Sequence, residues 1–208
     1  MSSRRSTVED PMREVADVTP DELASARPLR ADARRNYLLL VDAARAVFAE
    51  QGGDASMEAI AKRAGVGIGT LYRHFPKRID VVEAVYRTDV DGLVDLASAL
   101  VVDRAPWPAL VAWLEGFVRY AQTKRTFLSE LFEAFEKNPE LKSVSRERLH
   151  DAMASVLVRA QASGDVREDV DASDVMQLLG PMCTSPTLSD GQIERLLAVV
   201  EDGLRAPT

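Results

Sequence analysis

The chain is poor in the residues that form disulfides and metal sites. Cys183 is its only cysteine, so an intrachain disulfide is impossible and the paired-cysteine spacings of zinc sites are absent. The two histidines, His74 and His150, lie far apart and have no cysteine or carboxylate at ligand spacing. We therefore expect neither a metal nor a disulfide, which fits a reducing cytoplasm.

Long apolar segments are also missing. No run of about 18 apolar residues occurs, and the first residues are charged and include proline where a signal peptide would have an apolar segment. The sequence predicts no membrane span and no signal peptide. We expect a cytoplasmic protein without a membrane partner.

Signatures of catalysis are absent as well. The sequence contains no Ser-His-Asp order, no glycine-rich phosphate loop and no paired carboxylates on an apolar helix face. Glu130, Glu133 and Glu136 follow helical spacing and are typical of a solvated face. We predict that the chain is not an enzyme and needs no cofactor.

What the chain does contain is helical periodicity. Its 208 residues are 46% hydrophobic and 28% charged, which allows one large or two small domains with a core. No alternating strand pattern or internal repeat appears, so the predicted fold class is all-α.

Charge is unevenly distributed along the sequence. The net charge is −7, yet residues 27–87 hold 11 Lys and Arg against 7 Asp and Glu, whereas residues 88–208 hold 12 against 20. A basic module joined to an acidic one is typical of a DNA-binding domain attached to a separate regulatory domain. Positive charge strengthens DNA binding only on the surface that contacts phosphate.

The composition of residues 1–29 predicts a flexible arm. This segment has prolines, mixed charges and few aromatic residues, so it has little apolar surface to bury. The first helix is expected over about residues 31–51, ending at the Gly52-Gly53 pair. Its apolar face contains Leu40, Ala43, Ala44, Val47 and Phe48.

Residues 56–75 predict two short helices separated by a tight turn. Ser56 is a good N-cap, and Glu58 places a negative charge in the first turn. Gly65 can adopt the left-handed conformation that ends a helix, and Val66 can pack between the two helices. Leu71 and Phe75 form the buried face of the second helix, which leaves small, polar and basic residues to face a DNA groove.

The run Gly-Thr-Leu-Tyr-Arg-His-Phe-Pro at 69–76 follows Ser-Met-Glu-Ala-Ile-Ala-Lys-Arg-Ala-Gly-Val at 56–66 and a helix ending Phe-Ala-Glu-Gln-Gly. Together these segments resemble the DNA-binding domain of TetR-family transcriptional regulators, over roughly residues 34–86. The resemblance implies a three-helix helix-turn-helix domain at 30–78, with its reader at 56–75. It also implies a C-terminal helical ligand-binding and dimerisation domain at 79–208.

The resemblance further implies a homodimer that binds a palindromic double-stranded DNA operator. In the commonest mode of the family, the protein is a repressor that a small-molecule effector releases from its operator. The alternatives are a helix-turn-helix protein controlled by a protein partner, and a helical enzyme for which no catalytic residues are found.

Arg73 is our candidate for reading a base edge, with His74 as a second contact, although Arg73 could instead hold a phosphate. Thr70, Tyr72 and the Lys77-Arg78 pair are expected to contact the DNA backbone. In the family a basic residue opens the fourth helix and holds a phosphate. Arg78 falls on that position, and Lys77 stands where a capping residue is common. The full predicted DNA-contacting set is Arg34, Arg35, Ser56, Gly67, Ile68, Gly69, Thr70, Tyr72, Arg73, His74, Lys77 and Arg78.

Gly67 and Gly69 cost about 1 kcal/mol each inside a helix relative to alanine, so we expect them to allow a close approach of the backbone to DNA. They could instead be tolerated surface glycines. Arg34 and Arg35, and less so Arg27 and Arg30, could add minor-groove or backbone contacts, or the arm could be inert.

The remaining sequence predicts helices over about residues 77–101, from 106, from 127, and over 141–162, 172–184 and 190–204. Bulky residues of these helices could line a cavity for an apolar or aromatic effector, or could be plain core. The candidate ligand-binding residues are Trp113, Phe117, Tyr120, Phe127, Leu131, Phe132, Met153, Met176 and Cys183.

The last two predicted helices carry stripes that are more apolar than one packed neighbour requires. We expect them to form a four-helix contact around a twofold axis. The candidate dimer residues are Val175, Leu178, Leu179, Met182, Ile193, Leu196, Leu197, Val200 and Leu204.

Overall fold

The computed structural model describes residues 20–207, with side chains from residue 31 onward. Over that range the chain is all-helical, as predicted, and Val166 and Arg205 form an isolated bridge outside any strand. The helices are α1 (Pro20–Gln51), η1 (Gly52–Asp54), α2 (Met57–Ala64), α3 (Ile68–His74), α4 (Arg78–Asp103), α5 (Pro106–Arg125), α6 (Leu128–Lys137), α7 (Pro139–Ala162), α8 (Ala172–Thr184) and α9 (Asp190–Leu204).

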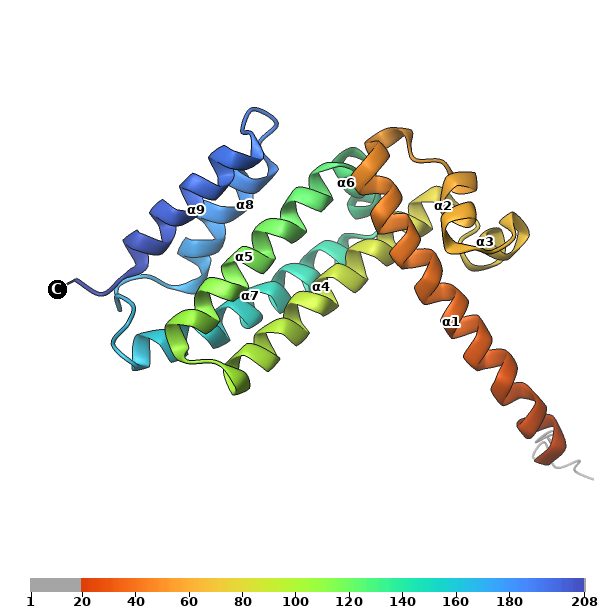
Figure 1. Cartoon of the computed structure of the whole chain (residues 1–208), viewed down its shortest axis with the longest axis horizontal. Coiled ribbons are helices and arrows are strands. Elements are labelled where there is room, and N and C mark those ends of the chain that lie inside the picture. Colours follow the sequence, from red (N-terminus) through yellow and green to blue (C-terminus); the bar gives the residue numbers. More distant parts are fainter. Residues whose placement is uncertain (1–19, 208) are drawn as a thin grey trace, which may run out of the picture.

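The first helix begins at Pro20, about eleven residues before the predicted start. Residues 20–29, predicted as part of a flexible arm, are therefore helical, whereas residues 1–19 lie outside the described residues. The beginning of α1 projects away from all other helices (Figure 1), and from residue 31 onward the first buried side chain is Leu40.

The segment from Ser56 to Phe75 forms the predicted helix-turn-helix. The Ser56 hydroxyl accepts a hydrogen bond from the Ala59 amide at 3.1 Å, as its N-cap position predicts. Gly65 ends α2 with φ 69°, and the Val66 amide donates to the Ala61 carbonyl at 3.1 Å. Because this pairing satisfies carbonyls at the end of α2, it fixes the direction in which α3 departs.

The long helix α4 connects the helix-turn-helix to the rest of the molecule, as Figure 1 shows. It packs against α1, α5, α6 and α7. Arg45 of α1 donates to the half-buried α4 residue Asp89 at 2.6 Å, and Trp113 of α5 donates through Nε1 to the Leu93 carbonyl at 3.1 Å. These bonds set the rotation of α1 and α5 around α4.

The last two helices cover one side of α5, and α9 is the outermost element of this layer (Figure 1). Both begin with reciprocal capping pairs, Asp171 with Asp174 and Ser189 with Gln192. Within the described range, no helix combines the length and apolarity needed to cross a membrane.

Gly65 and Gly69 offer a matched test of the turn, because a side chain at either position would meet no neighbouring atom within 4 Å. We expect Gly65→Ala to lower the free energy of unfolding by about 1–2 kcal/mol, because alanine disfavours the left-handed conformation. Gly69→Ala should raise it by up to about 1 kcal/mol, because position 69 lies within α3. Urea unfolding of both variants measures the difference, and equal shifts of the same sign would contradict this account of the turn.

Candidate functional site

One face of α3 is exposed and carries several of the predicted DNA-contacting residues. Ile68 and Tyr72 are 40% and 45% exposed, and Arg73 is also exposed. Gly69 lies in the first turn, whereas Gly67 is the residue before the helix and not inside it as predicted. No atom of the described chain approaches where their Cβ atoms would be, so packing does not require glycine at either position.

His74 lies at the edge of this face and is partly buried. Its ring meets Tyr37 of α1 in an edge-to-face arrangement with centroids 6.3 Å apart, and Tyr37 also packs against Phe75 at 5.3 Å. The imidazole therefore helps to hold α3 against α1. Thr70 is also partly buried.

The flanking predicted contacts are accessible. Arg34, Arg35 and Lys77 are exposed, and Arg35 lies 3.6 Å from Asp32. The Lys77 amide donates to the Asp80 carboxylate at 2.8 Å, so Asp80 compensates in part for the missing cap at position 77. This leaves the ammonium group of Lys77 free to face solvent.

Arg78 does not fit its predicted role as a phosphate contact. Its guanidinium donates to the carbonyls of Ala55 and Gly53, the latter at 3.3 Å, and to the Glu130 carboxylate at 2.9 Å. The same group lies over the Phe48 ring, 5.2 Å from its centroid. The Arg78 side chain points inward because these partners satisfy its hydrogen-bond donors there. It thereby links the N-terminal three-helix domain to α6.

The start of α6 is one of the points at which the C-terminal helices touch the N-terminal three-helix domain. Phe127, directly before α6, packs on Phe48 with ring centroids 5.0 Å apart. Burial acts to raise the pKa of Glu130, but hydrogen bonds from Arg78 and Ser129 outweigh it, so this pKa lies below its ordinary value. Glu130 is therefore a stable anionic partner for Arg78 at neutral pH.

A cavity of about 450 Å³ lies between α4, α5, α6, α7 and α8. Its volume falls within the range of small-molecule sites. Four predicted ligand-binding residues line it, namely Phe117, Tyr120, Phe132 and Met176.

The other five predicted ligand-binding residues are core and do not line this cavity. Trp113 is fully buried, and its indole N–H donates to the Leu93 carbonyl. Phe127 packs against Phe48. Leu131 and Met153 are fully buried. Cys183 is also buried, and this burial raises the pKa of its thiol to about 11, which makes it unreactive at neutral pH.

The cavity also has a basic lining that the sequence analysis missed. It is formed by Lys124 of α5 and by Lys142, Arg146 and His150 of α7. The α7 residues recur every four positions, a spacing that places them on one helical face and could have revealed them.

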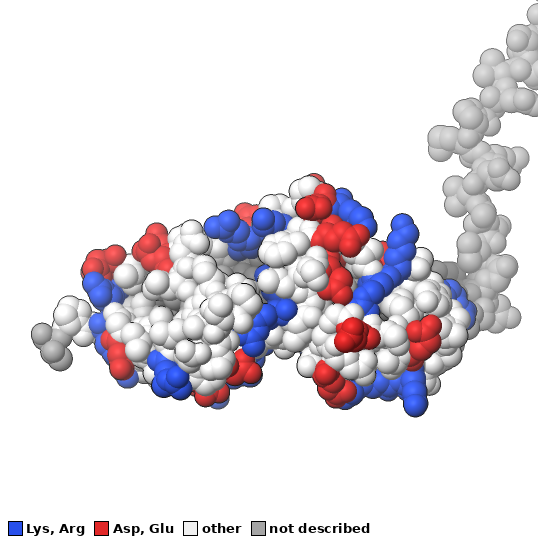
Figure 2. All heavy atoms as spheres, turned by 90° about the horizontal axis from the view of Figure 1, so that it is seen from above, with Lys and Arg blue, Asp and Glu red and all other residues white. Residues whose placement is uncertain are grey.

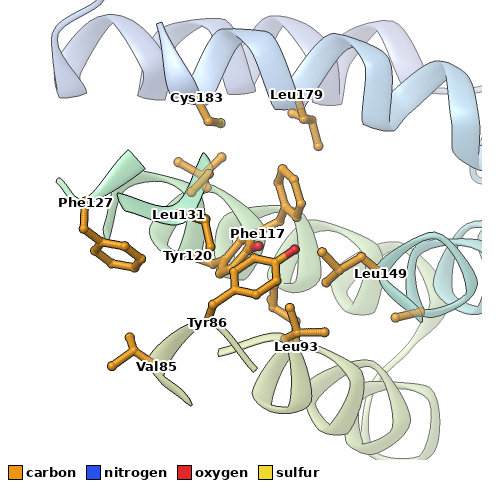
Figure 3. Packing of buried hydrophobic residues seen from close by; sticks show 14 of the residues in the cluster. Val85, Tyr86, Leu93, Phe117, Tyr120, Phe127, Leu131, Leu149, Leu179 and Cys183 are labelled. Carbon is orange, nitrogen blue, oxygen red and sulfur yellow. The ribbon is translucent and has the colours of Figure 1, made fainter. Parts of the chain in front are cut away.

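Lys124 lies deepest among these cations. Its Nζ is 5.6 Å from the Tyr86 ring centroid, 5.8 Å from that of Tyr120 and 6.0 Å from that of Phe135. Burial, and secondarily the charge of Lys142, lowers the pKa of Lys124 to about 8. Figure 3 shows Tyr86 and Tyr120 side by side, with their hydroxyl ends pointing the same way.

The predicted dimer residues divide into two groups. Five of them pack into the core of their own chain, because α8 and α9 use them to cover α5: Val175, Leu179, Ile193, Leu197 and Leu204. Leu178 and Leu196 are exposed, whereas Met182 and Val200 are partly buried. Val199, which the prediction omitted, is 66% exposed.

Charge on the molecular surface is more mixed than the sequence division suggests. On the face seen in Figure 2, positive and negative side chains intersperse at both ends of the molecule. No cluster of three or more histidine, cysteine, aspartate or glutamate side chains suited to a metal occurs among the described residues.

Comparisons with known proteins agree with this geometry. Residues 40–85 match the profile described as bacterial regulatory proteins, tetR family, and residues 105–206 match the transcriptional regulator SbtR-like C-terminal domain. The HTH-type transcriptional regulator UidR of Escherichia coli K12 is 26% identical over 190 residues, which cover 86% of this chain and 93% of UidR.

Two crystal structures are more similar. The TetR transcriptional regulator SCO0520 of Streptomyces coelicolor is 35% identical with a TM-score of 0.73, covering 83% of this chain and 99% of SCO0520. The TetR transcription regulatory protein of Mycobacterium vanbaalenii is 34% identical with a TM-score of 0.69, covering 86% of this chain and all of that protein. With its helix-turn-helix and its helical C-terminal domain, the chain belongs to the TetR family of DNA-binding transcriptional regulators, which are not enzymes.

Proposed function

We propose that this regulator is a homodimeric repressor that holds a palindromic operator with its α3 helices and releases it when a small molecule occupies the cavity. The observation that carries this proposal is the position of α6. One side of α6 contributes Phe132 and Phe135 to the cavity, and its first turn contributes Glu130 to the bond with Arg78.

The exposed face of α3 is suited to the major groove. Arg73 can form two hydrogen bonds with a guanine edge, and Thr70 and Tyr72 can donate to phosphates. Without side chains at positions 67 and 69, the backbone can approach the DNA closely. Lys77 adds a positive charge at the end of the reading segment.

The operator would be released if the ligand bound more tightly to a conformation in which α6 is placed differently. A ligand shifts an equilibrium only through its differential affinity for the two states, and the coupling is reciprocal. A ligand that moves Phe132 and Phe135 would move Glu130 on the same short helix. The displacement would reach the start of α4 through Arg78 and change the spacing of the two α3 helices in the dimer.

The dimer contact that we propose uses the exposed apolar strip formed by Leu178, Leu196 and Val199. Leu178 is 60% exposed, Leu196 is 39% exposed and Val199 is 66% exposed. Pairing α8 and α9 with their copies would bury this strip in a four-helix contact. Half-sites should then lie about one turn of DNA apart or more.

Arg73→Ala and Lys77→Ala should affect DNA binding in different ways. Loss of a base contact costs about 1–3 kcal/mol and relaxes preference at one position of each half-site. Loss of a phosphate contact weakens all sequences and lowers the salt slope by about 1 per contact. Selection of bound DNA fragments with the purified protein would first supply the operator, and binding to its variants at several salt concentrations measures both effects. An unchanged ranking of operator variants with Arg73→Ala would refute a base contact by Arg73.

The role of α6 predicts a difference between two neighbouring glutamates. Glu130→Gln should weaken operator binding by roughly 2- to 30-fold, because Arg78 loses its charged partner and the start of α4 is less restrained. Glu133→Gln is the control, since Glu133 is exposed and, among the described residues, pairs only with Lys137. Fluorescence anisotropy with the selected operator measures both. If the two variants bound the operator with equal affinity, α6 would not transmit the effect of the ligand. Control by a protein partner would then become the better explanation.

The dimer proposal predicts that Leu196→Glu combined with Val199→Glu gives monomers and abolishes operator binding. Both side chains are accessible in the chain, so the substitutions should leave its own core intact. Val158→Glu is the control, because Val158 is 60% exposed and lies on α7 and not on α8 or α9. Light scattering reports the mass, and circular dichroism checks the fold. A dimer that survives the double substitution would place the interface elsewhere.

A further inference from the structure

The cavity combines an aromatic interior with a cationic lining. Apolar and aromatic walls come from α4, α5, α6, α7 and α8, and the lining holds Lys124, Lys142, Arg146 and His150. Within the described structure, no aspartate or glutamate is among the lining residues. This composition differs from the cavity for an apolar or aromatic effector that the sequence suggested.

Lys124 has no acceptor of its own. Among the described residues its ammonium group makes no hydrogen bond and no ion pair, and the rings of Tyr86, Tyr120 and Phe135 surround it with centroids within 6.0 Å. Ring faces attract a cation, but they replace only part of its hydration. Burying part of an ammonium group without a carboxylate partner costs free energy. An anion that enters the cavity would supply the partner that the chain lacks.

Tyr120 provides a second unsatisfied group in the same place. The side chain is 8% exposed, and its hydroxyl lies beside that of Tyr86 without a hydrogen bond of normal geometry in the described structure. Buried hydroxyl groups normally have a partner, so this group is available as a donor to a ligand oxygen. Burial raises the pKa of Tyr120 well above its ordinary value, which keeps the hydroxyl protonated.

The rim of the cavity is also cationic and unpaired. Lys142 and Arg146 are exposed, and neither forms an ion pair with a described residue, whereas His150 lies 3.5 Å from Asp151. Two free cations at the mouth would draw an anion inward before it meets Lys124.

We propose that the cavity binds a small organic anion, a carboxylate on an apolar ring-bearing body, with Lys124 as its counter-ion and Tyr120 as its hydrogen-bond donor. The aromatic walls contact the ring body, among them Phe117, Phe132 and Phe135. The inference rests on the proposed function in that this ligand is the effector, and it adds a negative charge to the apolar or aromatic effector that the sequence suggested.

Binding should depend on pH in a defined direction. The anion binds the protonated form of Lys124, so affinity is full below pH 8 and falls up to tenfold per unit as the pH rises through the pKa of about 8 in the free protein. The other charged or titratable lining groups are Lys142, Arg146 and His150 on α7, Tyr86 on α4 and Tyr120 on α5. In the described structure, the lining residues of α6 and α8 bring no titratable group. Measurements from pH 7.5 to 9.5 avoid the usual range of histidine titration.

The test compares 2-naphthoate with its neutral isostere 2-naphthamide by isothermal titration calorimetry. We expect naphthoate to bind the full-length protein at least tenfold more tightly than naphthamide. Lys124→Met should weaken naphthoate binding on the order of 10- to 100-fold and leave naphthamide unaffected, whereas Tyr120→Phe should weaken it several-fold. Lys137→Met is the control, since Lys137 lies on α6 outside the cavity lining.

Lysine NMR gives a second readout, because the chain has only five lysines: Lys62, Lys77, Lys124, Lys137 and Lys142. Naphthoate should raise the pH at which the Lys124 signal titrates and leave Lys62 and Lys137 unchanged. Equal binding of naphthoate and naphthamide, or an unchanged naphthoate affinity with Lys124→Met, overturns the proposal. So does a failure of benzoate, phenylacetate and naphthoate alike to shift the Lys124 signal.

Operator binding separates this inference from the proposed function. Naphthoate that binds through Lys124 and lowers operator affinity supports both. Naphthoate that binds through Lys124 without changing operator affinity supports the anion site and contradicts ligand-controlled release.

Discussion

The bond between Arg78 and Glu130 is the constraint on which the arrangement of the molecule depends. Arg78 stands at the start of α4, and its guanidinium simultaneously caps the carbonyls around η1, covers Phe48 and reaches the carboxylate on α6. An arginine can make all of these contacts because its planar group has five donors and an apolar face. Removing one partner would leave a partly buried charge unpaired, so the helix-turn-helix and α6 are held in a single relative position.

The same short helix also contributes to the cavity. Along α6, Glu130 faces the helix-turn-helix while Phe132 and Phe135 face the space occupied by Lys124. A helix of ten residues packed on both sides cannot move one end without moving the other. The physical basis of the proposed regulation is therefore the two-sided packing of α6, and the unpaired ammonium group inside the cavity supplies the chemistry that a ligand can use.

Apolar surface on α8 and α9 serves two purposes. Residues such as Val175 and Ile193 complete the core against α5, whereas Leu178 and Leu196 lie on neighbouring faces of the same helices and remain exposed. In the sequence, the buried and the exposed residues belong to the same apolar stripe, because the stripe is wide enough to cover two neighbouring faces of each helix. Only the part that the chain leaves uncovered can hold a second copy.

Local sequence determined the helices and the helix-turn-helix. Ser56, Gly65 and the Leu71–Phe75 pair act through caps, backbone conformation and periodicity, which involve residues close together in the chain. Arg73 and Lys77 could be assigned to an exposed face on the same basis, although their DNA contacts remain predictions. Tertiary structure alone decided that Arg78 turns inward, that Trp113 and Cys183 are core, and that Lys124 enters a ring of aromatic side chains. Those outcomes depend on partners that are distant in the sequence, 20 residues apart for Trp113 and Leu93 and 52 apart for Arg78 and Glu130. Nothing in the local pattern of a helix specifies which neighbour its faces will meet.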